Sequence, residues 1–385
     1  MTLPIQRATT PQPPPSKGGG VRDWTNRHVI IGGGIIGLSI GWQLARRGHA
    51  VTIIEKGKVG HGASWVAAGM LAPYAEIGFE EVEFFRMCRE SLALYPKLLE
   101  ELSTDLNDAD VNVPLLDSCG TLLVAMTPDD EAYLKRFHEF QLRIGLRSSK
   151  LSSAEARERE PLLSPRTKSA LYLEADKQIN NRSLIGALGK AFEELGGEII
   201  QQPVDNLAAI EPSALTTIIA AGAYANNVSP ALQQSNPVRP VKGQIIMLRA
   251  TEQFKLQHMI RSPRGYVLQK DDGRIIVGAT AEEKGFDTSV TAGAVMDMLR
   301  NAYEVLPMTY ELEVTEISAG LRPATRSHLP EIGYSGHSNV FHAIGHYRHG
   351  ILLAPYTAYH LADLIGEKSN KSSHNPLMQA AIHIQ

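Results

Sequence analysis

The sequence of 385 residues contains only two cysteines, Cys88 and Cys119, and its net charge is only −3. Two cysteines cannot form a disulfide framework, and free thiols suit a reducing compartment, so we expect a cytoplasmic location. The near balance of charges excludes a strong field that would attract nucleic acid or an anionic membrane. No apolar run approaches the roughly 20 residues that a membrane-spanning helix needs, so we expect no membrane span.

Residues 1–27 also lack an apolar run, and prolines at positions 11 and 13–15 precede three glycines at positions 18–20. This composition predicts a disordered leader and excludes a secretory signal. The absence of acids before Asp23 leaves a transit peptide as the alternative. We expect a flexible tail over residues 367–385, and the length between these ends predicts two domains.

The most informative stretch is residues 29–55, which read VIIGGGIIGLSIGWQLARRGHAVTIIE. Short β-branched runs at residues 29–31 and 51–54 are typical of buried strands. Between them the apolar spacing is helical up to Arg46-Arg47, and Gly48 suits the left-handed position beyond a helix. Strand, glycine turn, helix and strand in this order predict a dinucleotide-binding βαβ unit.

The glycines and the acid of this unit have separate predicted roles. Gly32 permits the tight turn, Gly34 lets a pyrophosphate approach the backbone, and Gly37 lets helix and strand pack closely. The pyrophosphate would lie on the N-terminal amides of the helix, and Glu55 would bind a ribose hydroxyl while disfavouring a 2′-phosphate. An ordinary strand–helix turn is the alternative, and this unit alone leaves NAD and FAD open.

Small residues dominate the next segment, residues 58–73, which read KVGHGASWVAAGMLAP. So many small side chains predict a bulky group against the backbone, and after a dinucleotide fold that group is the flavin end of FAD. The alternative is a flexible Gly/Ala loop, which the apolar run Met70-Leu71-Ala72 disfavours because it requires burial.

The remaining patterns predict an α/β fold with two discontinuous domains. A second helix–strand pattern occurs around residues 181–200, and a buried strand is predicted at residues 216–222; we expect both to belong to the same sheet as the βαβ unit. Residues 240–317 predict antiparallel strands with one helix. We expect a Rossmann-like FAD-binding domain from residues 28–105, 170–238 and 318–366. We expect an antiparallel-sheet α+β substrate-binding domain from residues 106–169 and 239–317, which would form a roof over the cofactor.

Three histidines near the C-terminus, His342, His346 and His349, suggest a metal site. Only the first two have helical ligand spacing, and the segment reads as a strand and a glycine turn, so we expect no metal. The alternative is a loop and helix N-terminus directed at the cofactor ring, where the helix dipole stabilises negative charge.

Several of these stretches together resemble the glycine oxidases of thiamine biosynthesis, which belong to the D-amino acid oxidase-like flavoproteins. The resemblance spans residues 28–366, and its sharpest parts are the run AAGMLAP at residues 67–73 and the run GHYRHGILLAP at residues 345–355. Shorter matching runs lie at residues 241–243, 278–280 and 320–323. The resemblance implies an FAD-dependent oxidoreductase with non-covalent FAD, commonly a homotetramer.

The resemblance also implies a set of site residues. Arg322, expected on the loop after a strand at residues 311–317, would bind the substrate carboxylate with its bidentate guanidinium, together with the hydroxyl of Tyr266. Arg348 and Met70 would contact both substrate and flavin. The implied cofactor contacts are Ile35, Ile36, Glu55, Lys56, Ala63, Ser64, Ala68, Gly69, Met70, Val204, His346, Tyr347, Arg348, His349, Gly350, Ile351 and Leu352.

The implied reaction is the oxidative deamination of glycine. A hydride would pass from the substrate Cα to flavin N5 with the amine neutral, so no acid–base residue is required and catalysis rests on positioning. The imine would hydrolyse to glyoxylate and ammonia, and oxygen would reoxidise the flavin to give hydrogen peroxide. The implied partner is the thiazole-forming enzyme of thiamine synthesis, which consumes the imine.

Two residues depart from related patterns. Val66 stands where related dimethylglycine and sarcosine dehydrogenases carry a flavin-linking histidine, which argues against covalent FAD. Ala281 replaces a larger pocket residue of some members, so sarcosine and small D-amino acids stay open as substrates. Three alternatives also stay open: a dehydrogenase that passes electrons to a carrier or partner subunit, a non-catalytic flavin-binding protein, and an NAD dehydrogenase.

Overall fold

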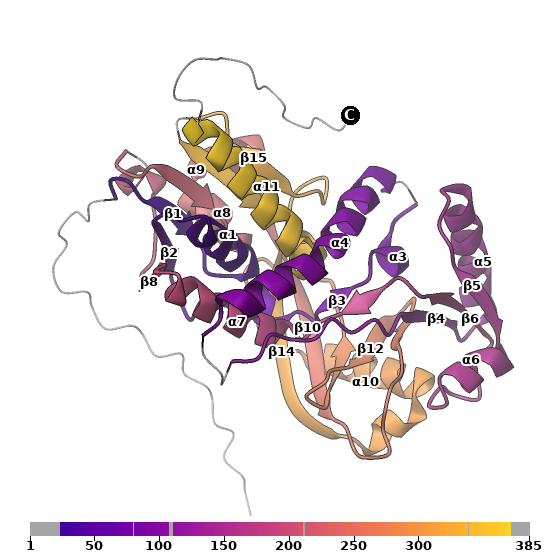
Figure 1. Cartoon of the computed structure of the whole chain (residues 1–385). Coiled ribbons are helices and arrows are strands. Elements are labelled where there is room, and N and C mark those ends of the chain that lie inside the picture. Colours follow the sequence, from indigo (N-terminus) through magenta and orange to yellow (C-terminus); the bar gives the residue numbers. More distant parts are fainter. Residues whose placement is uncertain (1–23, 80, 108–110, 211, 338, 371–385) are drawn as a thin grey trace, which may run out of the picture.

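The computed structural model describes residues 24–79, 81–107, 111–210, 212–337 and 339–370. They form two halves, each built on its own large sheet (Figure 1). Most of the expected leader and of the expected tail lies outside the described residues. In the described part of the chain, no helix is long and apolar enough to cross a membrane.

The first half contains a six-stranded sheet with the order β15-β16-β9-β1-β2-β8. Neighbouring strands are parallel, except that β15 is antiparallel to β16. The central strand β1 is buried along its whole length, as its β-branched run predicts. The strand bounds are His28–Ile31 (β1), Val51–Glu55 (β2), Glu198–Gln201 (β8), Thr216–Ile219 (β9), Glu331–Tyr334 (β15) and Val340–Ile344 (β16).

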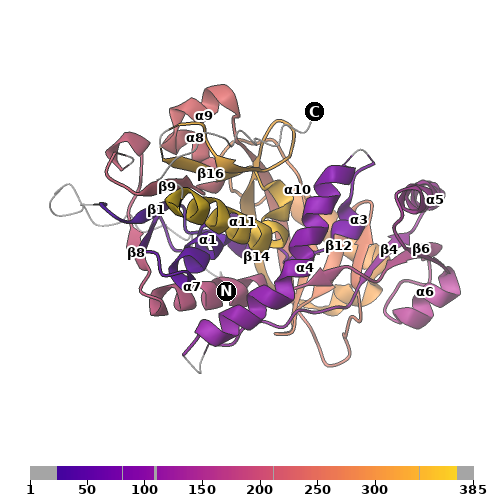
Figure 2. The ribbon, with the colours of Figure 1, turned by 45° about the horizontal axis from the view of Figure 1, so that its top comes forward.

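Four long helices accompany this sheet: α1 (Ile35–Arg46), α4 (Val82–Asp105), α7 (Asn181–Glu194) and α11 (Gly350–Asn370). The last helix, α11, packs against α1 and α4, so both ends of the described chain meet here (Figures 1 and 2). Helix α1 ends as predicted. Gly48 has φ +85°, its N–H donates to Ala45 O, and His49 N–H donates to Leu44 O, which together form a Schellman motif.

The second half contains an eight-stranded sheet with the order β14-β10-β13-β12-β11-β4-β6-β5. All neighbours are antiparallel except β4 and β11, which are parallel and far apart in sequence. The strand bounds are Thr121–Ala125 (β4), Ser149–Ser152 (β5), Ser169–Leu173 (β6), Arg239–Arg249 (β10), Met259–Ser262 (β11), Gly265–Gln269 (β12), Arg274–Gly278 (β13) and Glu313–Ala324 (β14).

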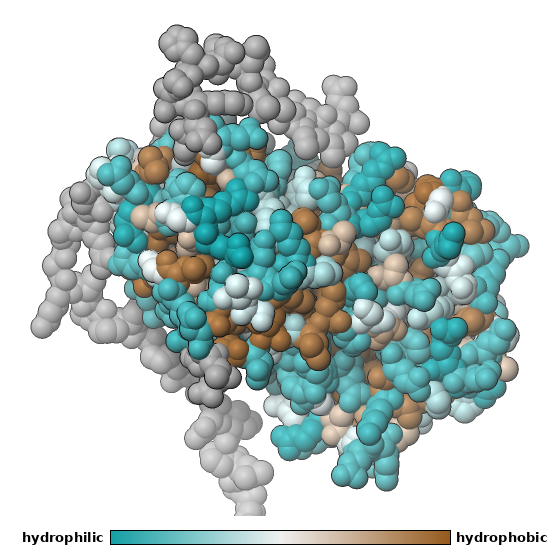
Figure 3. Space-filling view, in the orientation of Figure 1, coloured by the Kyte–Doolittle hydropathy of each residue, from teal (hydrophilic) through white to brown (hydrophobic). Residues whose placement is uncertain are grey.

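Three helices belong to this half: α5 (Pro128–Arg143), α6 (Ser153–Arg159) and α10 (Ala292–Val305). Thr127 and Ser152 each form a reciprocal capping box at the start of α5 and α6, with Asp130 and Glu155 three residues further on. Residues 271–273, which read Asp-Asp-Gly, lie in the hairpin that joins β12 to β13. On the face in Figure 3, hydrophilic residues predominate, and apolar residues gather near the middle, around α4.

Short elements connect the long helices and strands, and some of them lie at the junction between the halves. Ala68, Ala72 and Ala75 pack with the eight-stranded sheet, whereas Leu71 packs into the core of the first half. The small-residue segment therefore lies where the two halves meet. The short elements are Ala63–Val66 (α2), Met70–Leu71 (β3), Pro73–Glu76 (α3), Lys177–Gln178 (β7), Leu207–Ala209 (η1), Gly222–Tyr224 (η2), Ala225–Val228 (α8), Pro230–Ser235 (α9), Pro307–Glu311 (η3) and Tyr347–His349 (η4).

The predicted fold class is confirmed, but one local expectation is wrong. Arg322 lies inside β14, which extends to Ala324, and not on a loop after residue 317. The strand continues past Pro323 because β14 is an edge strand, where a missing N–H donor is tolerated. It passes Val66 because Gly320 has no side chain: a Cβ at position 320 would lie 3.0 Å from Val66 Cβ. The boundaries expected at residues 170 and 318 fall within β6 and β14, and the division into two domains stays a prediction.

Candidate cofactor and substrate site

A cavity of about 890 Å³ runs from the glycine turn after β1 to the eight-stranded sheet. Its size suits a large ligand, and both halves of the molecule contribute to its walls. Three of the predicted site residues, Gly37, His349 and Leu352, do not line it. The predicted residues that do are Gly32, Gly34, Ile35, Ile36, Glu55, Lys56, Ala63, Ser64, Ala68, Gly69, Met70, Val204, Tyr266, Arg322, His346, Tyr347, Arg348, Gly350 and Ile351.

The glycine turn has the geometry predicted for it. Gly32 has φ +111°, and a Cβ there would lie 2.3 Å from Ala220 O. A Cβ on Gly37 would lie 1.9 Å from Gly32 O, so this glycine permits the close packing of helix and strand and has no room to face the cavity. A Cβ on Gly34 would meet only Ser64 Oγ, at 3.3 Å.

The helix that follows this turn offers its first amides to the cavity. Gly34 provides no side-chain cap for α1, and Ile35 N–H donates to Ser64 Oγ at 3.0 Å. Ile35 and Ile36 both line the cavity. A helix N-terminus whose N-cap residue is a glycine with no side chain fits a pyrophosphate, since the helix dipole and the N–H groups of the first turn favour an anion.

At the end of β2 the carboxylate of Glu55 is held in a fixed position. It accepts hydrogen bonds from Gly33 N–H at 2.7 Å and from Gly57 N–H at 2.9 Å. Lys56 lies beside it, with Nζ 2.8 Å from the ring centroid of Tyr224. Sequence reasoning missed Tyr224, which also lines the cavity, because an aromatic residue after a small-residue strand end has no distinctive pattern.

The small residues between the halves are fixed from behind. Gly69 has φ +69°, and a Cβ there would lie 2.2 Å from Ile179 O. The buried ammonium of Lys270 donates to Ile179 O at 2.8 Å, to Gln178 Oε1 at 3.1 Å and to Gly69 O at 3.5 Å. Asn181 Nδ2 donates to Ser64 O at 2.7 Å. The cavity-facing backbone is therefore held by side chains on its other side.

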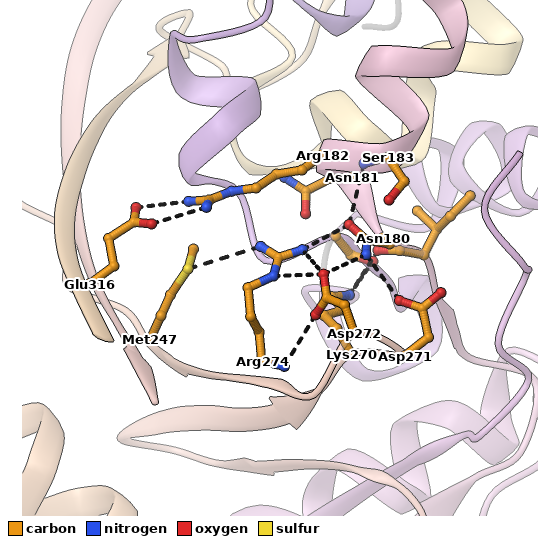
Figure 4. A network of polar contacts seen from close by, with 12 residues as sticks. Asn180, Asn181, Arg182, Ser183, Met247, Lys270, Asp271, Asp272, Arg274 and Glu316 are labelled. Carbon is orange, nitrogen blue, oxygen red and sulfur yellow. Dashed lines mark hydrogen bonds and ion pairs between the residues drawn. The ribbon is translucent and has the colours of Figure 1, made fainter. Parts of the chain in front are cut away.

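The N-terminus of α7 joins this segment to the second half of the molecule (Figure 4). Asn180 caps α7 and donates from Nδ2 to Asp271 and Asp272, both at 2.9 Å. Arg274 donates to Asn180 Oδ1 at 2.8 Å. Arg182 forms a bidentate ion pair with Glu316 of β14, with distances of 3.0 and 2.8 Å. These contacts fix the β12–β13 hairpin and β14 relative to the first half.

At the other end of the cavity, Arg322 has polar contacts but no acid partner in the described part of the chain. Its Nη1 donates to Thr280 O at 2.8 Å and lies 3.5 Å from Lys242 O. The guanidinium lies over Gly243, where a Cβ would be 2.3 Å from Nη2. A guanidinium without an acid partner in a cavity wall is suited to binding a carboxylate, because it offers a planar pair of donors.

Tyr266 lies over Gly278, where a Cβ would be 2.4 Å from the hydroxyl. Burial raises the pKa of Tyr266 to about 12, although the neighbouring Arg322 opposes this effect. The hydroxyl therefore keeps its proton at neutral pH and can donate a hydrogen bond. Arg322 of β14 and Tyr266 of β12 belong to one sheet, with β10 and β13 between their strands, and both side chains line the cavity.

Sequence reasoning missed a buried ion pair in the same wall. Arg261 Nη1 donates to Glu76 Oε1 at 2.5 Å, and both residues line the cavity. Burial alone would raise the pKa of Glu76, but Arg261, His349 and Arg348 together lower it to about 2. The two partners are separated by 185 positions, so only the fold brings them together.

Next to this pair, Arg348 Nε donates to His349 Nε2 at 3.2 Å. The proton of His349 is therefore assigned to Nδ1, which faces Glu76 Oε2 at 3.8 Å. Burial lowers the pKa of His349 to about 4, so the ring is neutral. Among the residues that the structure describes, Arg348 forms no ion pair, and no group of three metal-binding side chains occurs.

These features define the class of the protein. A βαβ glycine turn leads into a cavity long enough for a dinucleotide, and the cavity ends under a second sheet whose guanidinium groups suit a small anion. This is the architecture of a dinucleotide-dependent oxidoreductase with a substrate-binding roof.

Comparison with known proteins gives the family. Residues 27–364 match the family model DAO, FAD dependent oxidoreductase. The glycine oxidase of Geobacillus kaustophilus is 34% identical over 361 residues, covering 89% of this chain and 94% of that protein. The crystal structure of glycine oxidase from Geobacillus kaustophilus superposes with a TM-score of 0.82 at 33% identity, covering 89% of this chain and 95% of the other.

A second kind of relative is longer. The bifunctional protein ThiO/ThiG of Trichormus variabilis is 32% identical over 90% of this chain, which spans 53% of that protein. The chain belongs to the DAO family of FAD-dependent oxidoreductases, its cofactor is FAD, and the resemblance inferred from its motifs is confirmed.

Proposed function

We propose that this protein catalyses the FAD-dependent oxidative deamination of glycine, with sarcosine and small D-amino acids as further candidate substrates. Glycine, oxygen and water would give glyoxylate, ammonia and hydrogen peroxide. The observation that carries this proposal is the guanidinium of Arg322, which has no acid partner in the described residues and lies near the protonated Tyr266 hydroxyl in the cavity wall.

The residues of the cavity support this chemistry by binding and orientation. Arg322 would bind the carboxylate through two parallel hydrogen bonds, and Tyr266 would donate a third. When bound, FAD supplies the acceptor for the two electrons that leave the substrate as a hydride. The positive charge of Arg322 and Arg348 favours a substrate whose amine is neutral, so the site needs no separate base.

The size of the pocket leaves room for more than glycine. Ala281 lines the cavity, and a residue with so small a side chain suits N-methyl and short Cα substituents. Val66 lines the same cavity and offers no nucleophile, which agrees with non-covalent FAD. We assign the substrate contacts to Tyr266, Arg322, Arg348 and Met70.

The physiological role that we propose is the supply of the imine product to the thiazole-forming enzyme of thiamine biosynthesis. Relatives named ThiO/ThiG and described as bifunctional support this proposal, since their chains extend well beyond the part matched here. We further propose a homotetramer, as the motif resemblance implies. We propose a cytoplasmic location, because Cys88 and Cys119 are both free cysteines.

The test is the variant Arg322→Met, with Arg326→Met as its control because Arg326 is exposed on the loop after β14. Loss of the charged hydrogen bonds should slow reduction of the flavin by glycine roughly 10- to 100-fold at subsaturating substrate. The control should keep the parental rate. An unchanged rate in Arg322→Met would show that the carboxylate binds elsewhere.

The electron acceptor is tested separately with an oxygen electrode. The oxidase proposal expects oxygen uptake and hydrogen peroxide formation when glycine is added to the aerobic parent protein. Bleaching of the flavin by glycine without oxygen uptake would instead favour a dehydrogenase that passes electrons to a carrier or partner subunit.

A further inference from the structure

The segment between β13 and α10 runs over the surface of the molecule. Residues 283–290 form one run in which every residue is exposed, and this run, named the strap below, carries two large apolar side chains, Phe286 and Val290. Because the strap buries so little apolar surface, its attachment depends on its two ends and on a few specific contacts.

Both ends of the strap are fixed to β10 by one buried glutamine. Gln244 Nε2 donates to Glu282 Oε1 at 2.7 Å, and Gln244 Oε1 accepts from Thr291 N–H at 2.9 Å. Glu282 also exchanges two backbone hydrogen bonds with Lys242, at 2.9 and 3.0 Å. The ends therefore lie close together, which is the geometry of an Ω-loop, a kind of surface loop that often has a function of its own.

The strap joins the two halves of the molecule beside the cavity. Phe286 stacks on Tyr224 of η2 in the first half, with ring centroids 4.9 Å apart and an interplanar angle of 27°. Tyr224 lines the cavity and contacts Lys56, and Thr288 of the strap lines the cavity too. The strap is therefore part of the cavity wall close to the end of β2, where Glu55 suits a ribose.

A second contact attaches the strap to the sheet of its own half. Lys242 is fully buried, and its Nζ lies 2.8 Å from Oδ2 of Asp287, whose side chain is 45% exposed. Displacement of the strap would leave this buried ammonium without its acid. Asp287 also accepts hydrogen bonds from Ser289 N–H at 2.9 Å and from Ser289 Oγ at 3.0 Å, which keeps the strap in shape. The strap thus has two separate attachments, a ring contact to the first half and an ion pair to the second.

The other walls of the cavity are held more firmly. They consist of strands, helices and the small-residue segment, which Lys270 and Asn181 hold from behind. A cofactor as large as FAD enters and leaves through the part of the wall whose displacement costs least. The strap fits this description, because its displacement exposes little new apolar surface and breaks only a few contacts.

We propose that residues 283–290 are a mobile strap that closes the cavity around bound FAD, with the stack of Phe286 on Tyr224 as its latch, and that opening of this latch limits the release of the cofactor. This inference concerns FAD and is independent of the substrate.

The test measures the exchange of FAD on the holoprotein. Protein loaded with isotope-labelled FAD is mixed with an excess of unlabelled FAD, and the label that remains bound is followed with time. Phe286→Ala should exchange FAD roughly 2- to 10-fold faster than the parent, since the stacked rings stabilise the closed strap. Asp287→Asn should exchange FAD about tenfold faster, because the buried ammonium loses its charged partner.

Val290→Ala is the matched control. Val290 is the other large apolar residue of the strap, is 40% exposed and does not line the cavity. Its loss removes exposed apolar surface without touching the stack, so exchange should keep the parental rate. In excess FAD, all of these variants should carry the parental amount of flavin per chain, measured by absorption, whereas a damaged fold would carry less.

Locking the latch should have the opposite effect, which damage to the fold cannot imitate. In a variant with both Phe286→Cys and Tyr224→Cys, a short reagent with two methanethiosulfonate groups joins the facing side chains. Exchange should then slow by more than about tenfold relative to the same variant without the reagent, and dithiothreitol should restore it. Parent protein treated with the reagent controls for Cys88 and Cys119.

Three results would overturn the proposal. A parental exchange rate in Phe286→Ala, or unaltered exchange after cross-linking, would mean that FAD leaves by another route. Equal acceleration in Val290→Ala and Phe286→Ala would mean that the stack is not a latch. A parental rate in Asp287→Asn alone would support the proposal and assign the latch to the ring contact without the ion pair.

Discussion

Replacing Lys270 with methionine should remove a large part of the pH dependence of stability of this protein. Lys270 is buried, and its ammonium has only neutral acceptors: Ile179 O, Gln178 Oε1 and Gly69 O. Burial lowers the pKa of Lys270 to about 7, from an ordinary value of 10.5. Methionine keeps the unbranched shape and most of the length of the side chain and removes the titrating group.

The sign follows from proton binding. Between pH 7 and pH 10.5 the unfolded chain holds a proton on Lys270 that the folded chain has released, so the free energy of unfolding of the parent rises with pH. The slope from this one group is about 1.4 kcal/mol per pH unit, or roughly 4 kcal/mol from pH 7 to pH 10. Below pH 7 both states are protonated and the contribution is constant.

The assay is urea unfolding of the holoprotein at pH 7, 8, 9 and 10, followed by far-UV circular dichroism. The variant leaves three acceptors without their donor, which costs roughly 1–3 kcal/mol for each unsatisfied group, so it should be less stable than the parent at pH 10. The difference in free energy of unfolding between the parent and the variant should narrow steadily from pH 10 towards pH 7.

The control for this experiment is Lys177→Met, because Lys177 forms its hydrogen bond with Ser118 at an exposed position. The control should follow the parent curve with a constant offset. Parallel pH curves for the parent and Lys270→Met would refute the reasoning, since they would mean that Lys270 keeps its ordinary proton affinity in the folded state.

Three other substitutions test separate parts of the site. Gly37→Ala should yield protein without bound FAD, because the new Cβ would lie 1.9 Å from Gly32 O. Bound FAD is measured by absorption near about 450 nm. The control Gly186→Ala should keep the cofactor, since position 186 has open space around it. Tyr266→Phe should weaken acetate binding about tenfold in a flavin titration through loss of one charged hydrogen bond, and unchanged affinity would exclude the hydroxyl from the receptor. Glu76→Gln should flatten the acid limb of the unfolding curve: the pKa of Glu76 is lowered to about 2, so its stabilisation is complete above pH 4.5 and is lost, by up to about 3 kcal/mol, as the pH falls towards 2. A parental acid limb in that variant would contradict the lowered pKa.

Local signals in the sequence predicted the nucleotide half well. The roles of Gly32 and Gly37 depend on contacts within about five residues or with an adjacent strand, and their spacing already contains that information. The caps Thr127 and Ser152 act within one turn of helix, so a hydroxyl residue three positions before an acid is enough to specify them. The same holds for the left-handed Gly48 after α1.

The substrate end was less predictable because its geometry depends on long-range contacts. Gly320 and Pro323 look like the end of a strand, yet β14 continues through them because it needs partners on only one side. Glu76 and Arg261 give no local pattern, since a single acid on a one-turn helix and a single cation in a strand are ordinary surface residues until the fold buries them together.

The order of strands in the six-stranded sheet has a consequence for biosynthesis. The strand β1 leaves the ribosome before the others, but the sheet is completed only by β15 and β16, and the last wall of the cavity is formed by residues between 343 and 351, from the end of β16 to the start of α11. Long-range pairing of this kind is slow, and a partly made chain exposes unpaired strand edges. The nascent chain therefore cannot enclose its cofactor until residue 351 has been made, which places the loading of FAD after the synthesis of the other cavity walls.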